Sequence, residues 1–194
     1  MLKERLRPYI VALGKEEVRS ISRRYFISNG FDGTLTSIGI AIGSYLSGVP
    51  SGLTVFKVAL GAAVGLATSG VWSVWEIERA ETKAEMKEIE EAMLTDLEGT
   101  KLQEGKNAGR VVNAVMSGIG PTFGIILPAI PFLFEGTVLN MMQATLFAVG
   151  IGVLDLFLFG AYMADISGQR WYIAGLRMGL AGIAVAVINI LLPG

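Results

Sequence analysis

The positions of the charged residues constrain this chain more than any other feature of its sequence. Of the 16 basic and 17 acidic residues, only Asp32, Lys57, Asp155 and Arg177 lie inside long apolar stretches. These stretches cover residues 27–48, 53–75, 111–134, 138–164 and 171–192. Each reaches the length of about 20 residues that a helix needs to cross the hydrocarbon core of a bilayer. We therefore predict an all-α, polytopic membrane protein with five transmembrane helices.

The composition narrows the chemistry that the chain can perform. Only 17% of its residues are charged, and it contains no cysteine and no histidine. Disulfides, thiolate nucleophiles and the commonest metal ligands and proton shuttles are therefore excluded. The sequence also contains no nucleophile–base pair and no phosphate-binding loop outside its apolar segments. We expect neither an enzyme nor a protein with a resident cofactor.

The basic residues predict how the chain is oriented in the membrane. Residues 1–24 hold seven of them and residues 76–110 hold six, whereas the turns at 49–52 and 135–137 hold none. By the positive-inside rule, the N-terminus and the 76–110 segment are cytoplasmic and the C-terminus is outside. No cleavable signal peptide is expected, because the charged first 24 residues lack a continuous apolar core.

Four regions follow from this topology. Residues 1–24 are predicted to form an amphipathic basic helix on the inner membrane surface, although a solvated basic arm would fit the same pattern. Residues 25–75 hold transmembrane helices 1 and 2, and residues 111–194 hold helices 3 to 5. Residues 76–110 form a cytoplasmic acidic helical insert between helices 2 and 3. No nucleic-acid partner is expected, because the basic residues flank a membrane entry point that already requires them.

Asp32 is the first candidate for function. It lies in the first span between Gly30 and Gly33, where a carboxylate costs about 2.5–3.5 kcal/mol and normally faces the bundle interior with a partner. The alternatives are an Asp32 that reaches the near interface or one that pairs structurally with Arg177. Asp155 and Arg177 occupy the same half of the bilayer by their distance from the span ends. Asp32 and Asp155 are therefore candidate residues of a transport path.

Two methionines are candidates for the same path. Met116 in span 3 and Met178 in span 5 lie at a depth close to that of Asp32. Thioethers beside a carboxylate suit Fe²⁺ better than Mg²⁺ or Ca²⁺, which prefer oxygen ligands. The alternative is that both methionines only fill space between helices.

The third span is rich in glycine and proline, with Pro121, Pro128 and Pro131 among them. We expect kinks there and carbonyls without helical partners, as in the broken helices that line transport paths. Glycine pairs four residues apart at 39/43, 61/65 and 175/179 predict close helix packing.

Acidic residues are concentrated between residues 76 and 104. On a helix, four glutamates share an arc of about 80° and Glu91 extends it; the full set is Glu78, Glu81, Glu85, Glu88 and Glu91. Like charges at these spacings disfavour a helix by about 0.2–0.5 kcal/mol per pair, so a bound cation would relieve them. We predict a metal-collecting face, with a solvated continuation of the second span as the alternative.

The segment 30–36 (Gly-Phe-Asp-Gly-Thr-Leu-Thr), preceded by Arg23 and Arg24, resembles the first span of the vacuolar iron transporter family. The order of five spans, an acidic insert after span 2 and a Gly/Pro-rich third span at 124–132 is similar as well. The chain has Ser69-Gly70 where the family commonly has Ser-Met, and its insert is shorter than usual.

This resemblance implies a homodimeric antiporter in the prokaryotic cell membrane that exchanges cytosolic Fe²⁺ or Mn²⁺ for protons. It places Asp32 in the translocation path, where it would alternate between proton and metal, and it gives the insert glutamates the task of collecting metal. The alternative function is a membrane scaffold or regulatory protein whose acidic helix binds a basic partner.

Overall fold

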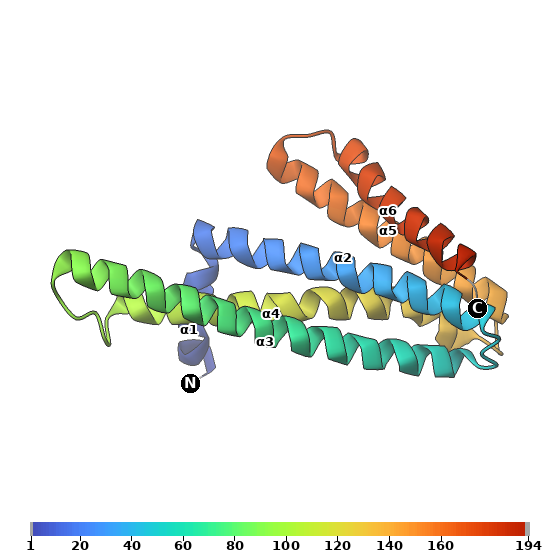
Figure 1. Cartoon of the computed structure of the whole chain (residues 1–194), viewed down its shortest axis with the longest axis horizontal. Coiled ribbons are helices and arrows are strands. Elements are labelled where there is room, and N and C mark those ends of the chain that lie inside the picture. Colours follow the sequence, from blue (N-terminus) through green and yellow to red (C-terminus); the bar gives the residue numbers. More distant parts are fainter. Residues whose placement is uncertain (1, 193–194) are drawn as a thin grey trace. The chain divides into compact units, whose positions relative to one another are not determined.

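The computed structural model describes residues 2–192, with side chains at 7–164 and 166–192. In this part of the chain, helices follow one another with short connections (Figure 1). They are α1 (Leu2–Leu13), α2 (Glu16–Leu46), α3 (Gly52–Met93), α4 (Lys101–Ala129), the 3₁₀ helix η1 (Ile130–Phe134), α5 (Met141–Ser167) and α6 (Trp171–Leu191). The all-α class expected from the sequence is confirmed.

Four helical stretches of the described chain are long and apolar enough to cross a membrane. They are Gly52–Met93, Lys101–Phe134, Met141–Ala164 and Trp171–Leu191. The segment 27–48, expected as the first span, forms part of α2 and is not in this group, because Asn29, Asp32 and several hydroxyl residues make it more polar. The structure thus supports an integral membrane protein, and the fifth span stays a prediction.

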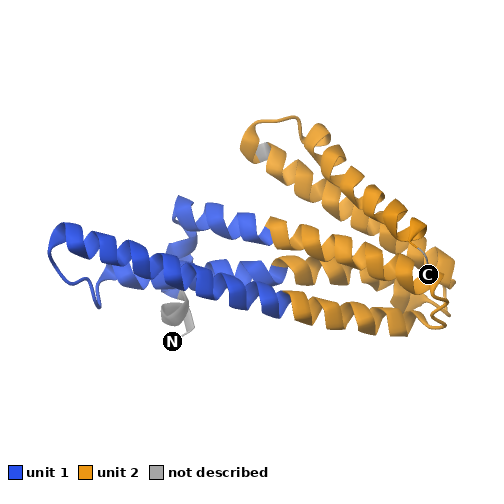
Figure 2. Ribbon diagram, viewed as in Figure 1, with its two compact units in different colours: residues 1–26, 67–119 blue, residues 27–66, 120–194 orange. Residues whose placement is uncertain are grey.

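The chain divides into two compact units, and the division falls within α2, α3 and α4 (Figure 2). Unit 1 comprises Met1–Phe26 and Ala67–Ile119, and unit 2 comprises Ile27–Leu66 and Gly120–Gly194. Each unit has its own buried apolar side chains.

Unit 1 differs from the sequence prediction at its N-terminus. Residues 1–24 were expected to form one helix, but α1 ends at Leu13 and α2 begins at Glu16. The Gly14 N–H donates to the carbonyls of Ile10 and Val11, which closes the last turn of α1. Acidic residues in the first turn, Glu16 and Glu17, favour a new helix N-terminus there.

The acidic region of unit 1 continues the flanking helices. Residues 76–93 extend α3, residues 101–110 begin α4, and the connection between them carries Gly99 in the left-handed conformation at φ 73°. The apolar core of this unit joins Ala12, Val18, Ala108 and Val112, with Met116 packed against them.

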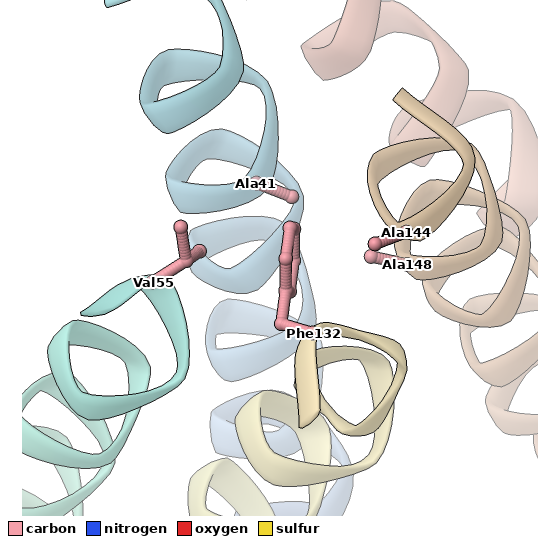
Figure 3. Close-up of a cluster of buried hydrophobic side chains, with 5 residues drawn as sticks. All are labelled: Ala41, Val55, Phe132, Ala144 and Ala148. Carbon is pink, nitrogen blue, oxygen red and sulfur yellow. The ribbon is translucent and has the colours of Figure 1, made fainter. Parts of the chain in front are cut away.

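Phe132 is the largest side chain in one core of unit 2. It projects from η1 among Ala41 of α2, Val55 of α3, and Ala144 and Ala148 of α5 (Figure 3). Because its neighbours are mostly alanines, the helix backbones approach closely around the ring.

Glycines allow equally close packing of α5 and α6. A Cβ atom added to Gly160 would lie 2.5 Å from the carbonyl oxygen of Ala174, and one added to Gly175 would lie 2.8 Å from the ring of Phe157. The packing predicted for the 175/179 pair is thus present within the chain. Gly61 and Gly65 on α3, by contrast, have open space in front of them.

The third apolar segment remains helical through its first two prolines. Pro121 and Pro128 both lie inside α4, and the change to 3₁₀ geometry comes at Ile130, next to Pro131. The expected interruption is therefore confined to the end of the segment.

Candidate functional site

One face of α2 is buried in unit 2, and Asp32 lies on another face. Gly30, Gly33, Thr34 and Ser37 are buried at helical spacing, whereas Asp32 is exposed. Successive helical residues are about 100° apart, so the small residues that allow close packing turn Asp32 away from it. The sequence led us to expect Asp32 inside the bundle, and the single chain instead presents its carboxylate to the surroundings.

The suggested ion pair between Asp32 and Arg177 is also absent from the described residues. Arg177 lies on α6 and is exposed, and the ion pairs of this part of the chain involve other residues. Met178, next to it, is half-buried. The structure does not gather these side chains around Asp32.

Among the described side chains of unit 2, the buried carboxyl group is that of Asp155 on α5. Asp155 is 4% exposed, and its Oδ2 lies 2.8 Å from Oγ1 of Thr34, which is fully buried on α2. The same Oγ1 lies 2.9 Å from the carbonyl oxygen of Gly30. One hydroxyl group therefore stands between two oxygen atoms at hydrogen-bond distance.

The Thr34 hydroxyl group has fewer protons than it has nearby oxygen atoms to share them with. A threonine hydroxyl has one proton to donate. When it donates to the Gly30 carbonyl, the contact with Asp155 needs a proton on the carboxyl group, donated to Thr34 Oγ1. When Asp155 is ionised, the hydroxyl must turn to the carboxylate and leave the carbonyl. Both short distances are satisfied together with Asp155 protonated.

Tight packing surrounds this pair. A Cβ on Gly33 would lie 2.6 Å from the carbonyl oxygen of Pro121, and a Cβ on Gly124 would meet the carbonyl oxygen of Gly30 and, at 2.7 Å, Oγ1 of Thr34. Helices α2 and α4 therefore touch through their backbones beside Thr34. Such contact fixes the position of the Thr34 hydroxyl group that meets Asp155.

In unit 1, the glutamates of the predicted acidic face lie on α3 and differ in their partners. Glu78 is 9% exposed and accepts a hydrogen bond from Tyr25. Burial raises the pKa of Tyr25, and the charge and hydrogen bond of Glu78 with the charge of Glu81 raise it further, against a small opposite effect of Arg24. The tyrosine therefore stays neutral and holds Glu78 as a structural acceptor.

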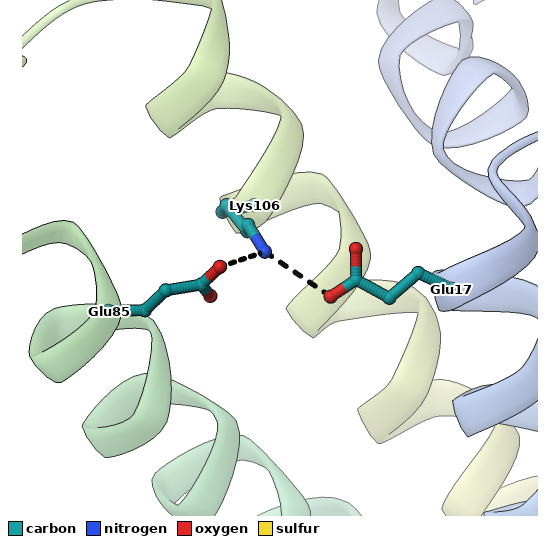
Figure 4. A network of polar contacts seen from close by, with 3 residues as sticks. All are labelled: Glu17, Glu85 and Lys106. Atoms are coloured by element: carbon teal, nitrogen blue, oxygen red, sulfur yellow. Dashed lines mark hydrogen bonds and ion pairs between the residues drawn. The ribbon is translucent and has the colours of Figure 1, made fainter. Parts of the chain in front are cut away.

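Glu85 belongs to a second contact, centred on Lys106 of α4. The Lys106 Nζ donates to Glu85 Oε1 at 2.8 Å and to Glu17 Oε1 at 3.3 Å (Figure 4). Burial alone would lower the pKa of Lys106, but the hydrogen bonds and charges of Glu85 and Glu17 outweigh it and raise the pKa. Lys106 thus links α2, α3 and α4 of unit 1.

The remaining glutamates of this face are exposed. Glu81 and Glu88 make no ion pair among the described residues, and Glu91 lies 3.7 Å from Lys87 of its own helix. No group of three or more acidic side chains in the described part of the chain is arranged to hold a metal ion. Met116 packs against the apolar core of unit 1. The predicted collector is therefore an acidic surface of α3, without a preformed cluster.

Sequence reasoning missed two features of the structure. One is the contact of Thr34 with Asp155, for which the signal was a hydroxyl residue on the small-residue face of α2. The other is the stacking of the Arg110 guanidinium on the Trp75 ring, 4.4 Å from its centroid. The sequence signal for that contact was a tryptophan at the end of the second predicted span and an arginine just before the third, both at the membrane boundary.

Comparison with known proteins now decides the family. A model described as the VIT family matches residues 73–193. The chain belongs to the VIT family. The match includes the acidic face of α3, Asp155 and Met178, and it begins after the Asp32 segment that carried the resemblance seen in the sequence. Membership implies membrane transport of metal ions, and this is a family of transporters, not enzymes.

The chain is also similar to an uncharacterized protein of Methanocaldococcus jannaschii. The two are 25% identical over 168 residues, which is 85% of each chain. No solved structure matches the chain significantly.

Proposed function

We propose that this VIT-family protein exports Fe²⁺, and also Mn²⁺, from the cytosol in exchange for protons. The buried contact of Asp155 with Thr34 carries the proposal of proton coupling, because the single hydroxyl proton can go to the Gly30 carbonyl or to the carboxylate, and a proton on Asp155 would let both contacts be made at once. Metal transport itself follows from membership of the family.

Metal collection is assigned to the exposed part of the acidic face. Glu81 and Glu88 are the members without an ion-pair partner in the described chain, so their charge is available to attract a cation. Glu78, Glu85 and Glu91 add to the local field although each already has a neighbour. A surface of this sign raises the local cation concentration at the cytoplasmic entrance.

Within the membrane, Asp32 meets the cation and Asp155 carries the proton. Asp32 is exposed on α2 and can reach a hydrated ion, whereas Asp155 is buried and its carboxyl group contacts the Thr34 hydroxyl. This division modifies the expectation that Asp32 alone alternates between metal and proton. Met178, half-buried on α6, is proposed as a softer thioether contact on the same path, and Met116 as a further one.

The protein is proposed to act as a homodimer in the prokaryotic cell membrane. Exposed Asp32 supports this, because a carboxylate that faces lipid is costly and a second copy would remove it from lipid. The open glycines of α3, Gly61 and Gly65, offer a surface for close helix packing.

Flux in proteoliposomes tests the proposal. Wild-type protein should move Fe²⁺ faster when the side that receives the metal is the more acidic one, and internal pH should change in step with metal. The Asp32→Asn variant should lose metal flux, and Lys57→Gln, which alters an exposed charge at the outer end of span 2, serves as the matched control. Metal flux at the wild-type rate in Asp32→Asn would contradict the path.

A further inference from the structure

A hollow on unit 1 lies on the side of α3 opposite the acidic face. It has a volume of about 400 Å³ and lies between the second half of α3 and the start of α4. Four cationic side chains line it, Arg79, Lys83 and Lys87 from α3 and Arg110 from α4, against one carboxylate, that of Glu90. The amides of Gln103 and Asn107 add neutral hydrogen-bond donors.

The carboxylates around the hollow neutralise little of this positive charge. Glu90 Oε1 accepts the backbone N–H of Leu97 at 3.1 Å, so it is engaged with the loop after α3. Arg79 lies 3.6 Å from Glu76 and Lys87 lies 3.7 Å from Glu91, and all four side chains are at least half exposed. Solvent-exposed ion pairs at these distances are weak, so they neutralise little of the charge of Arg79 and Lys87. Lys83 has no ion pair among the described residues.

Arg110 is fixed in position and lacks a hydrogen-bond partner on one nitrogen. Its guanidinium stacks on the ring of Trp75, and its Nε is buried without an acceptor in the described structure. Buried donors are satisfied in the great majority of cases, so this guanidinium, which also lines the hollow, retains unused hydrogen-bonding capacity. A guanidinium held by stacking presents its remaining N–H groups in a plane, which suits the oxygen atoms of a phosphate.

We infer that this hollow binds a phosphate group, and that the group belongs to the headgroup of an anionic lipid. The proposal does not depend on the transported ion. Trp72 and Trp75 lie at the end of the apolar part of α3, where aromatic side chains mark the membrane interface. Basic pockets at that level are suited to anionic headgroups. A lipid bound there would join α3 to α4 on the side of α3 opposite the acidic face.

Lipid and free phosphate are separated by two binding measurements on the full-length purified protein. Native mass spectrometry compares retention of phosphatidylglycerol with that of phosphatidylcholine, and calorimetric titration with inorganic phosphate tests the soluble source. The expected result is at least tenfold preference for phosphatidylglycerol and no saturable binding of inorganic phosphate. Saturable phosphate binding that competes with the lipid would support the site and overturn its assignment to a lipid.

Substitutions of residues that line the hollow test whether the lipid binds there. Lys83→Gln changes an exposed side chain and leaves the fold intact, and Arg110→Lys keeps the charge but removes the planar donor set; each should reduce the lipid preference several-fold. Lys101→Gln removes an exposed charge of α4 outside the hollow and is the matched control. Equal retention in Lys83→Gln, Arg110→Lys and wild type, or an equal loss in Lys101→Gln, would overturn the site.

Discussion

At the scale of single residues, two aspartates of unit 2, both expected from the sequence to lie inside the membrane bundle, differ in burial. Asp32 is exposed, and Asp155 is buried against Thr34. The difference comes from the face on which each helix packs: α2 uses its glycines and hydroxyl residues for contact, and the carboxylate two positions before Thr34 therefore points elsewhere. Under the proposed function, the buried carboxyl group of Asp155 is therefore the one assigned to carry the proton.

Replacement of Asp155 by asparagine should separate proton coupling from folding. The side-chain amide of the Asp155→Asn variant can donate to Thr34 Oγ1 as the protonated carboxyl group does, so the free energy of unfolding should change by less than about 1 kcal/mol. Metal-driven proton movement in proteoliposomes should be lost. Infrared spectra of the wild type should contain the band of a protonated carboxyl group that is missing in the Asp155→Asn variant.

A control for this prediction removes the other partner. Thr34→Val leaves the carboxyl group buried without its hydrogen bond, which should destabilise the protein by about 1–3 kcal/mol. Unchanged proton coupling in Asp155→Asn, together with an unchanged infrared spectrum, would show that Asp155 does not carry the proton.

Gly33 provides a second prediction at this scale. Gly33→Ala would place a methyl group 2.6 Å from the Pro121 carbonyl, which is backbone and cannot turn aside. The substitution should destabilise the protein by about 1–3 kcal/mol, measured by thermal unfolding in detergent. Gly43→Ala is the matched control on the same helix, since its methyl group meets nothing within 4 Å. Equal melting temperatures for the two variants would contradict the close contact of α2 with α4.

At the scale of helices, the sequence predicts which segments are helical better than it predicts where each helix ends and which of its sides is buried. Long runs of apolar residues predict helices, because backbone N–H and C=O groups in lipid must form their hydrogen bonds within the helix. The break at Gly14 and the continuity of α3 through residues 76–93 depend on packing and local caps. Which glutamates are engaged also depends on distant partners, as Tyr25 for Glu78 and Lys106 for Glu85 illustrate.

Lys106 should stabilise unit 1 in a pH-dependent manner. Its pKa is raised in the folded state, so its contribution is fully present below the ordinary value of 10.5 and is lost as the pH rises through the folded pKa. Lys106→Gln should lower the free energy of unfolding at pH 8 by about 1 kcal/mol, since both acceptors are largely exposed. Melting temperatures of the variant and wild type should converge once the pH has risen through the folded-state pKa of Lys106, which lies above its ordinary value. A difference that grows with pH would contradict the ion pairs.

The exposed glutamates of α3 give a prediction about metal collection. Glu81→Gln with Glu88→Gln should weaken Mn²⁺ binding to the purified protein, measured by calorimetry, without change in melting temperature, because neither carboxylate has an ion-pair partner in the described structure. Glu76→Gln, outside the predicted acidic face, is the control. Undiminished binding in the double variant would favour the alternative in which this face binds a basic protein partner.

At the scale of the whole molecule, the number of membrane crossings decides whether α2, and with it Asp32, lies within the membrane. Four helical stretches of the described chain meet the length and hydropathy needed, and the apolar part of α2 is more polar than these. With five crossings the polar face of α2 must be covered by protein or water within the membrane, whereas with four it stays at the surface. Five crossings place the two chain termini on opposite sides of the membrane, and four crossings place them on the same side.

The absence of cysteine from the sequence makes this question directly testable. Single cysteines at Ser20, Ser47 and Leu192 occupy exposed positions, before the apolar part of α2, after it and after α6. With five spans, a membrane-impermeant maleimide should label position 20 from the cytoplasmic side and positions 47 and 192 from outside. Labelling of 20 and 192 from one side would mean that α2 does not cross, and Asp32 would then lie outside any transmembrane path. Agreement with five spans would instead place Asp32 inside the membrane, as the proposed transport path needs.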